Sequence, residues 1–232
     1  MDPFLMKLTA KGKYYAELSV MLLVIIPALV YWDSAVIFPV KLFVVLLHES
    51  SHAFAALLTG GTVSEISINF ELGGNCVSKG GYVPLIACAG YIGSLISGVL
   101  LLYSSTHYTR GKMICNIFAG LFSLMILLMN SFWGILAASV FALLMIVSPR
   151  FLPEFVHHTF MAVLGTLISL YAIIDIREDL FNSEYIMTDA QMMAGITGIP
   201  AIVWSLFWLL LSVVVLYLML KRKFGKGKPG VK

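Results

Sequence analysis

The chain has 232 residues, of which 60% are hydrophobic and 12% are charged, and its formal net charge is +3. A soluble domain of this length needs far more polar surface to cover its core, so the composition excludes an ordinary soluble protein. Several apolar stretches approach the roughly 20 residues with which a helix crosses a bilayer. The sequence therefore predicts an all-α multi-pass membrane protein, with residues 1–232 forming a single membrane-embedded domain.

Seven apolar segments have about the length of membrane-spanning helices. They lie at 17–32, 35–58, 83–103, 112–129, 131–148, 157–178 and 200–220. Only Asn130 and Ser131 separate the fourth segment from the fifth, which predicts a tight helical hairpin or one broken helix, and six spans is the alternative count. No small-x-small cleavage site follows the first segment, so we expect a retained span rather than a signal peptide.

The C-terminal tail, residues 221–232, carries most of the excess positive charge. Basic residues beside membrane spans favour the cytoplasm, so we expect a cytoplasmic C-terminus. With seven spans the acidic stretch 178–189 lies on the other side, but Lys7, Lys11 and Lys13 then lie outside as well, against the rule. A basic tail this short is more typical of a membrane anchor than of a nucleic-acid-binding segment. We therefore expect the lipid bilayer, and not nucleic acid, as a partner. The sequence favours no particular oligomeric state.

The second segment, 35–58, carries His48, Glu49 and His52 in an otherwise apolar helix. The two histidines are one turn apart on one face, so both imidazoles can reach a single ion. Zn²⁺ held there acts as a Lewis acid, and the glutamate accepts a proton from water. Packing or interhelical hydrogen bonding is the alternative role, but ionisable groups inside a membrane are costly and usually functional. The HExxH pattern therefore predicts one zinc ion per chain.

Residues 62–80 follow a different period. Apolar and polar residues alternate in TVSEISINFEL, Gly73-Gly74 offers a turn, and NCVSKGGY can return as a second strand. The pattern predicts a small membrane-associated β-hairpin after the HExxH helix. Its unpaired outer edge would invite an extended peptide by strand addition.

The third segment contains two rows of small residues at steps of four. The rows are Ala89, Gly93 and Ser97, and Gly90, Ser94 and Gly98. Such rows let helix backbones approach closely in lipid, which predicts tight packing against this helix.

The chain resembles the small site-2-protease-like intramembrane zinc metallopeptidases in HESSHAFAALLTGG, in the hairpin that follows, and in GGYVPLIACAGYIGS. It is also similar to the C-terminal half of the same branch in LYAIIDIREDLF and TDAQMMAGITGIPAIVWSLFW. The resemblance implies that His48 and His52 bind zinc, that Glu49 is the general base, and that a later helix supplies a third ligand. It further implies that the substrate is a transmembrane protein or peptide. The sequence has neither the NxxPxPPLDG-type segment of the better-known site-2 proteases nor a PDZ domain.

Two histidines leave a catalytic zinc one protein ligand short of the usual three. We predict Asp175, because it is the only acid preceded by a long uncharged run, LGTLISLYAII. An aspartate there is costly unless a cation or partner compensates it. An interfacial cap or a salt bridge to Arg177 is the alternative role for Asp175. Asp179 and Asp189 are the rival ligands, and Asp189 is equally easily an N-terminal helix cap.

Four further polar residues lie in apolar surroundings. His157 and His158 open the sixth segment, where an interfacial pair is more often solvated than bound to a metal. Asn116 and Asn130 could donate to an oxyanion, but an interhelical hydrogen bond or a turn is the commoner role. We rank all four below the HExxH residues as site candidates.

Three functions fit these patterns. The first is an intramembrane zinc metalloprotease, and the second is a non-proteolytic chaperone or adaptor descended from one. The third is a transporter whose histidines lie on an ion path. Glu49 favours the protease, since a binding scaffold has no need of a proton acceptor beside two metal ligands. The lack of inverted-repeat patterning counts against a transporter.

Overall fold

The computed structural model describes residues 10–32, 34–182 and 188–225 of the chain. Within these residues, six helices are long and apolar enough, by length and composition, to cross a membrane. They are α3 (Phe38–Leu58), α4 (Val83–Ser104), α5 (Tyr108–Met125) with the short turn η1 (Ile126–Leu128), α6 (Phe132–Phe151), α7 (Glu154–Asn182) and α9 (Ala201–Gly225). The predicted multi-pass helical bundle is confirmed.

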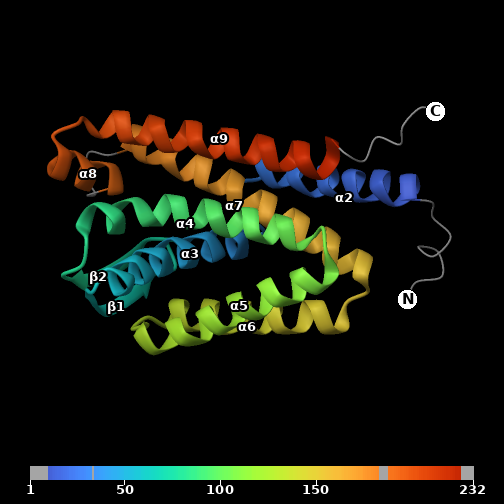
Figure 1. Cartoon of the computed structure of the whole chain (residues 1–232), viewed down its shortest axis with the longest axis horizontal. Coiled ribbons are helices and arrows are strands. Elements are labelled where there is room, and N and C mark those ends of the chain that lie inside the picture. The colour runs from blue at the N-terminus through green and yellow to red at the C-terminus, as the bar shows by residue number, and fades with distance from the viewer. Residues whose placement is uncertain (1–9, 33, 183–187, 226–232) are drawn as a thin grey trace.

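The first predicted segment forms α2 (Ala10–Val30), whose apolar part, Tyr14–Val30, is shorter than the six spans. This helix packs on α7, and its beginning lies beside the end of α9 (Figure 1). The hydroxyl of Tyr14 donates to the carbonyl oxygen of Phe224 at 3.0 Å, and Lys223 Nζ forms an ion pair with Glu17 Oε1 at 2.7 Å. The beginning of α2 and the end of α9 therefore lie together at one end of the bundle.

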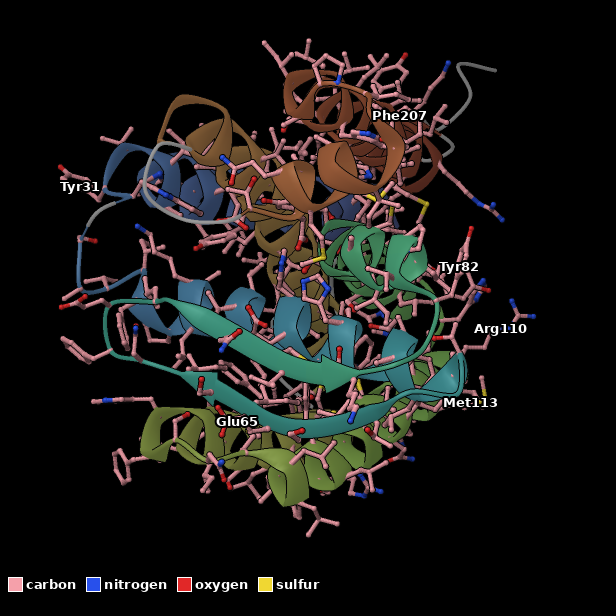
Figure 2. The ribbon with its side chains drawn as sticks, turned by 90° about the vertical axis from the view of Figure 1, so that its left-hand side faces the viewer. Tyr31, Glu65, Tyr82, Arg110, Met113 and Phe207 are labelled. Atoms are coloured by element: carbon pink, nitrogen blue, oxygen red, sulfur yellow. The ribbon has the colours of Figure 1, made fainter. Side chains whose placement is uncertain are left out.

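Both ends of α3 lie at the opposite end of the bundle. At its start, the ring of Phe38 is 6.1 Å from that of Trp133, in the first turn of α6. Just after its end, Thr59 Oγ1 accepts a hydrogen bond from the amide of Tyr82, which precedes α4. Because α4 and α6 begin at the same end of the bundle, α3 lies obliquely across it (Figures 1 and 2).

The small residues of α4 allow close helix contacts, as predicted. A Cβ atom added to Gly98 would lie 2.9 Å from the carbonyl oxygen of Gly165 on α7, and one added to Gly165 would lie 2.6 Å from that of Gly98. On the other row, an added Cβ at Gly93 would overlap the side chain of Ser51 on α3. Such close backbone contacts stabilise helix pairs where lipid provides no hydrophobic driving force. They hold α4 between α3 and α7.

The predicted hairpin is confirmed as β1 (Thr62–Ile68) and β2 (Gly74–Lys79), which pair antiparallel. Ile66 and Ile68 are fully buried in the core of the bundle, which fixes the register of β1. At the tip, the amide of Asn69 donates to the carbonyl oxygen of Gly73, and the Asn69 side chain accepts from the Gly73 amide at 2.8 Å.

The outer edge of β1 is not open. The loop between η1 and α6 pairs with it, because Met129 forms a bridge with Ile66 and the amide of Asn130 donates to the Ile66 carbonyl at 3.0 Å. The amide of Ile68 donates to Ser131 Oγ at 2.8 Å. The tight hairpin predicted between the fourth and fifth segments is thus confirmed, and it covers one edge of the sheet. Within the part of the chain that the structure describes, no further strand pairs with the outer edge of β2.

Candidate metal centre

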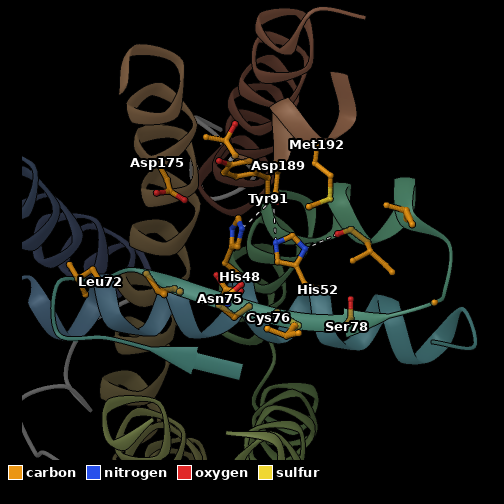
Figure 3. A pocket seen from close by; sticks show the side chains of 18 residues that line it. His48, His52, Leu72, Asn75, Cys76, Ser78, Tyr91, Asp175, Asp189 and Met192 are labelled. Atoms are coloured by element: carbon orange, nitrogen blue, oxygen red, sulfur yellow. Dashed lines mark hydrogen bonds and ion pairs between the residues drawn. The ribbon is translucent and has the colours of Figure 1, made fainter. Parts of the chain in front are cut away.

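Helix α3 brings the HExxH side chains into the interior. Pro39 fits its first turn, where a missing amide costs nothing, and the apolar residues before the motif are buried in the bundle core. His52 and Glu49 are less than 10% exposed, and the imidazole centroids of His48 and His52 are 4.7 Å apart. The one-turn spacing therefore places both rings on one buried face, as predicted (Figure 3).

The third member of the group is Asp189, the first residue of α8 (Asp189–Thr197). Its Oδ2 atom lies 3.3 Å from Nε2 of His48 and 3.3 Å from Nε2 of His52. Potential ligand atoms of these three residues all lie within 4.8 Å of one another. Burial alone would raise the pKa of the Asp189 carboxyl, but its contacts with the two imidazoles hold that pKa below the ordinary value.

Local sequence explains how Asp189 comes to be available. Thr188 is the N-cap of α8 and forms a reciprocal capping box with Gln191. The cap is therefore Thr188, not Asp189, and the aspartate side chain faces α3 instead. A Thr-x-x-Gln box followed by an apolar helix was the signal in the sequence that could have separated these two roles.

Asp175, our predicted third ligand, is not part of this group. It lies on α7 and lines the same cavity as the histidines, so the expected proximity is present. The difference arises because α8 folds back toward α3 and brings its first residue to both imidazoles. The side chain of Asp179 lies outside the described residues.

The surroundings of the three residues fit a metal ion. A Cβ atom added to Gly90 would lie 2.6 Å from Nε2 of His52 and still closer to Nε2 of His48, so glycine keeps this space beside both nitrogens clear. Asp189 Oδ2 is buried, and it faces the Nε2 atoms of both histidines at 3.3 Å. Two imidazole nitrogens and one carboxylate oxygen are a donor set that suits Zn²⁺ with a further position open.

Neighbouring residues orient the two histidines differently. Nδ1 of His52 donates to the carbonyl oxygen of Ile86 at 2.7 Å, which orients the ring with Nε2 toward Asp189. The ring of His48 packs edge-to-face on that of Tyr91, with centroids 4.9 Å apart. One ring is thus held by a hydrogen bond and the other by aromatic packing.

Glu49 lies between the histidines and β2. A Cβ atom added to Gly74 would lie 2.6 Å from Cγ of Glu49, so the first residue of β2 must be small where it passes this side chain. The glutamate is 8% exposed, and it lines the cavity with both histidines.

The cavity has a volume of about 610 Å³ and runs along β2, between this strand and helices α3, α4, α7 and α8. The carbonyl group of Ile66 and the amide group of Ile68 point away from β2, toward residues 129–131. Their partners across the ladder are Cys76 and Gly74. In an antiparallel pair, such residues point their amide and carbonyl groups outward on both strands. Cys76 and Gly74 therefore present these groups to the cavity side of β2.

The lower-ranked candidates lie elsewhere. His157 is fully buried near the beginning of α7, far along that helix from Asp175. Asn130 donates to Glu65 Oε2 at 2.7 Å, and Asn116 accepts from Arg150 at 3.0 Å. None of these side chains is among the described residues that line the cavity.

The sequence matches the model of the peptidase M50B-like family over residues 20–219. This match covers most of the chain, which therefore belongs to that family of site-2-protease type, and the predicted resemblance is confirmed. Membership points to a metallopeptidase, zinc-dependent as the family is in general, and the apolar helices to an integral membrane protein. No curated protein and no solved structure matches the chain.

Proposed function

We propose that this family member is an intramembrane zinc metalloprotease, which hydrolyses peptide bonds of membrane-protein substrates within or near the bilayer. One observation carries the proposal: a single cavity contains the His48–His52–Asp189 group, the carboxylate of Glu49 and the free edge of β2. A metal-binding group, a proton acceptor and a place for an extended peptide are the three parts that peptide hydrolysis requires.

His48, His52 and Asp189 would hold the ion. Zinc, when bound, supplies a Lewis acid that polarises the peptide carbonyl and makes water more acidic. Glu49 takes a proton from the attacking water as the new C–O bond forms. It then gives that proton to the departing nitrogen as the C–N bond breaks, so that an amine leaves and a carboxylic acid remains. Burial of Glu49 among apolar helices strengthens its interaction with the ion.

The substrate would bind as an added strand. A transmembrane helix shields its own peptide groups, so it must unwind locally before it can be cut, and the freed backbone groups then need partners. The outward amide and carbonyl groups of Gly74 and Cys76 supply such partners beside Glu49. These groups support strand addition on β2, since residues 129–131 cover the edge of β1.

The competing function is a membrane-protein chaperone or adaptor that binds at the same edge without cleavage. Such a protein needs the groove but not a proton acceptor. The close passage of Gly74 over Glu49, in the cavity that holds the metal-binding group, favours the protease.

The test uses the full chain, purified and reconstituted with zinc in lipid vesicles. Single-span model substrates with a helix-destabilising segment are incubated with wild type, Glu49→Gln and Glu65→Gln, the last being a carboxylate outside the cavity. Wild type and Glu65→Gln should cleave at one position. Glu49→Gln should keep its zinc and lose roughly 10²–10⁴-fold in rate. Equal cleavage by Glu49→Gln excludes this general base, and binding of substrates without cleavage by wild type favours the chaperone.

A further inference from the structure

Two buried aromatic side chains connect the metal-binding group with α9. They are Tyr91 of α4 and Trp208 of α9, whose side chains are 4% and 1% exposed. The ring of Tyr91 packs edge-to-face on that of His48, and its centroid lies 5.1 Å from that of Trp208. The three rings therefore form one continuous line of contacts from α3 through α4 to α9.

His48 depends on this line of contacts more than His52 does. Nδ1 of His52 donates to the carbonyl oxygen of Ile86, whereas Nδ1 of His48 is buried and has no hydrogen-bond partner among the described residues. A histidine that binds a metal usually donates its second ring nitrogen to a neighbouring group, which fixes the orientation of the ring. For His48 the described structure provides the ring of Tyr91 instead, and an edge-to-face pair also favours one relative orientation.

Tyr91 and Trp208 belong to a small buried cluster that is separate from the main core of the bundle. This cluster also contains Ala190 and Met193 of α8. Ala190 directly follows Asp189 in the sequence, and Met193 lies one helical turn after Asp189. The same cluster therefore supports the helix that supplies the third member of the metal-binding group.

Trp208 is unusual within its own helix. Its neighbours Leu206, Phe207 and Leu210 are more than half exposed, whereas Trp208 is fully buried. No residue of α9 is among the described residues that line the cavity. Any effect of Trp208 on the metal-binding group must therefore pass through the residues that it contacts.

From these contacts we infer that Tyr91 and Trp208 are positioning residues of the metal centre. Tyr91 orients the ring of His48, and Trp208 supports both Tyr91 and the first turns of α8. The inference rests on the metal-binding group of the proposed function. Ligands that are oriented in advance lose less conformational entropy when the ion binds. Removal of the Trp208 ring should therefore weaken metal binding and change the geometry of coordination, in addition to any loss of stability.

Metal binding by the purified full chain in detergent tests this assignment without any need for turnover. Competition with a chelator measures the affinity for zinc, and Co²⁺ bound in place of zinc gives visible absorption bands that depend on the geometry of its ligands. Trp208→Leu and Tyr91→Leu should each weaken zinc binding by about tenfold or more and shift the cobalt bands. Trp208→Phe and Tyr91→Phe keep an aromatic ring, so they should bind zinc nearly as wild type does.

Trp32→Leu is the matched control, because Trp32 is a buried tryptophan of the main core, with its ring 5.2 Å from that of Tyr171. It should lower the temperature of unfolding but keep the zinc affinity and the cobalt bands of wild type. Wild-type metal binding by folded Trp208→Leu protein overturns the assignment, and so does an equal loss of zinc affinity in Trp32→Leu. If Trp208→Leu does not fold, the comparison of Tyr91→Leu with Tyr91→Phe decides by the same criteria.

The same measurements separate this inference from the proposed function. A wild-type chain that binds neither zinc nor cobalt would refute both the inference and the proposed function. A wild-type chain that binds zinc but cleaves no substrate would refute the proposed function alone, since the effects of Trp208→Leu on metal binding would still be measurable.

Discussion

Asp189 Oδ2 and His52 Nε2 lie 3.3 Å apart, although the two residues belong to helices that are distant in the sequence. The ring of His52 is oriented by its hydrogen bond to the carbonyl oxygen of Ile86, and Asp189 lies in the first turn of α8, directly after the N-cap. Each side chain is thus oriented by its own element before any ion binds. Preorganised ligands of this kind lose little conformational entropy on binding a metal.

Asp189→Asn replaces an anionic ligand with a neutral amide. It should therefore weaken zinc binding by more than the roughly 10–100-fold loss of affinity that follows when a residue hydrogen-bonded to a metal ligand is replaced. Asp175→Asn should keep the affinity of wild type. Competition with a chelator of known affinity and elemental analysis measure both. Zinc retained by Asp189→Asn and lost by Asp175→Asn would restore Asp175 as the ligand.

Gly90→Ala should prevent zinc binding while the bundle still folds. The new methyl would occupy the space beside the two Nε2 atoms, where an ion must sit to reach both. Gly120→Ala is the matched control, since an added Cβ there meets nothing within 4 Å. Thermal unfolding in detergent should separate a lost metal site from a lost fold. Normal zinc content in folded Gly90→Ala protein would argue against this position for the ion.

Local patterns predicted much of this structure. The one-turn spacing of His48 and His52 depends only on helix geometry, and the period of two in residues 62–68 depends only on strand geometry. The small residues of α4 likewise predicted its close contacts. In each case the informative residues lie within a few positions of one another.

Features that depend on distant segments were not predictable in this way. The third member of the metal-binding group depends on how α8 folds back onto α3, and the uncharged run before Asp175 carries no information about that fold. The closing of the β1 edge depends on contacts of Ile66 with Met129 and Asn130, far along the chain. Hydropathy shows that α3 is long enough to span a membrane. It does not show that α3 begins and ends at the same end of the bundle.

The free edge of β2 gives a backbone test of substrate binding. Cys76→Pro removes an outward amide without removing a ladder hydrogen bond, so it should lower kcat/KM about tenfold or more while zinc content stays normal. Cys76→Val keeps the amide and changes only the side chain, and it should cleave like wild type. Wild-type activity in both variants would contradict strand addition. An equal loss of activity in both variants would assign the effect to the side chain.

The last prediction concerns orientation. The beginning of α2 and the end of α9 lie together, beside Ser105 at the end of α4, whose hydroxyl accepts a hydrogen bond from Lys223 at 2.6 Å. Basic residues favour the cytoplasm, so both termini and the α4–α5 loop should face it, and the α8–α9 loop should face the other side. In a cysteine-free background, Thr106→Cys and Ile199→Cys probe the two loops, both exposed.

A membrane-impermeant maleimide, applied to sealed vesicles with the cytoplasmic face outward, should label Thr106→Cys at once and Ile199→Cys only after permeabilisation. Vesicles of the opposite orientation should give the reverse pattern, and an N-terminal epitope tag should be cleaved by added protease together with a C-terminal one. Tags protected on different sides would mean that α2 does not accompany α9 across the membrane. The cavity lies at the end of the bundle away from the beginning of α2 and the end of α9. Tags on one side, together with an inverted labelling pattern, would place the cavity toward the cytoplasm.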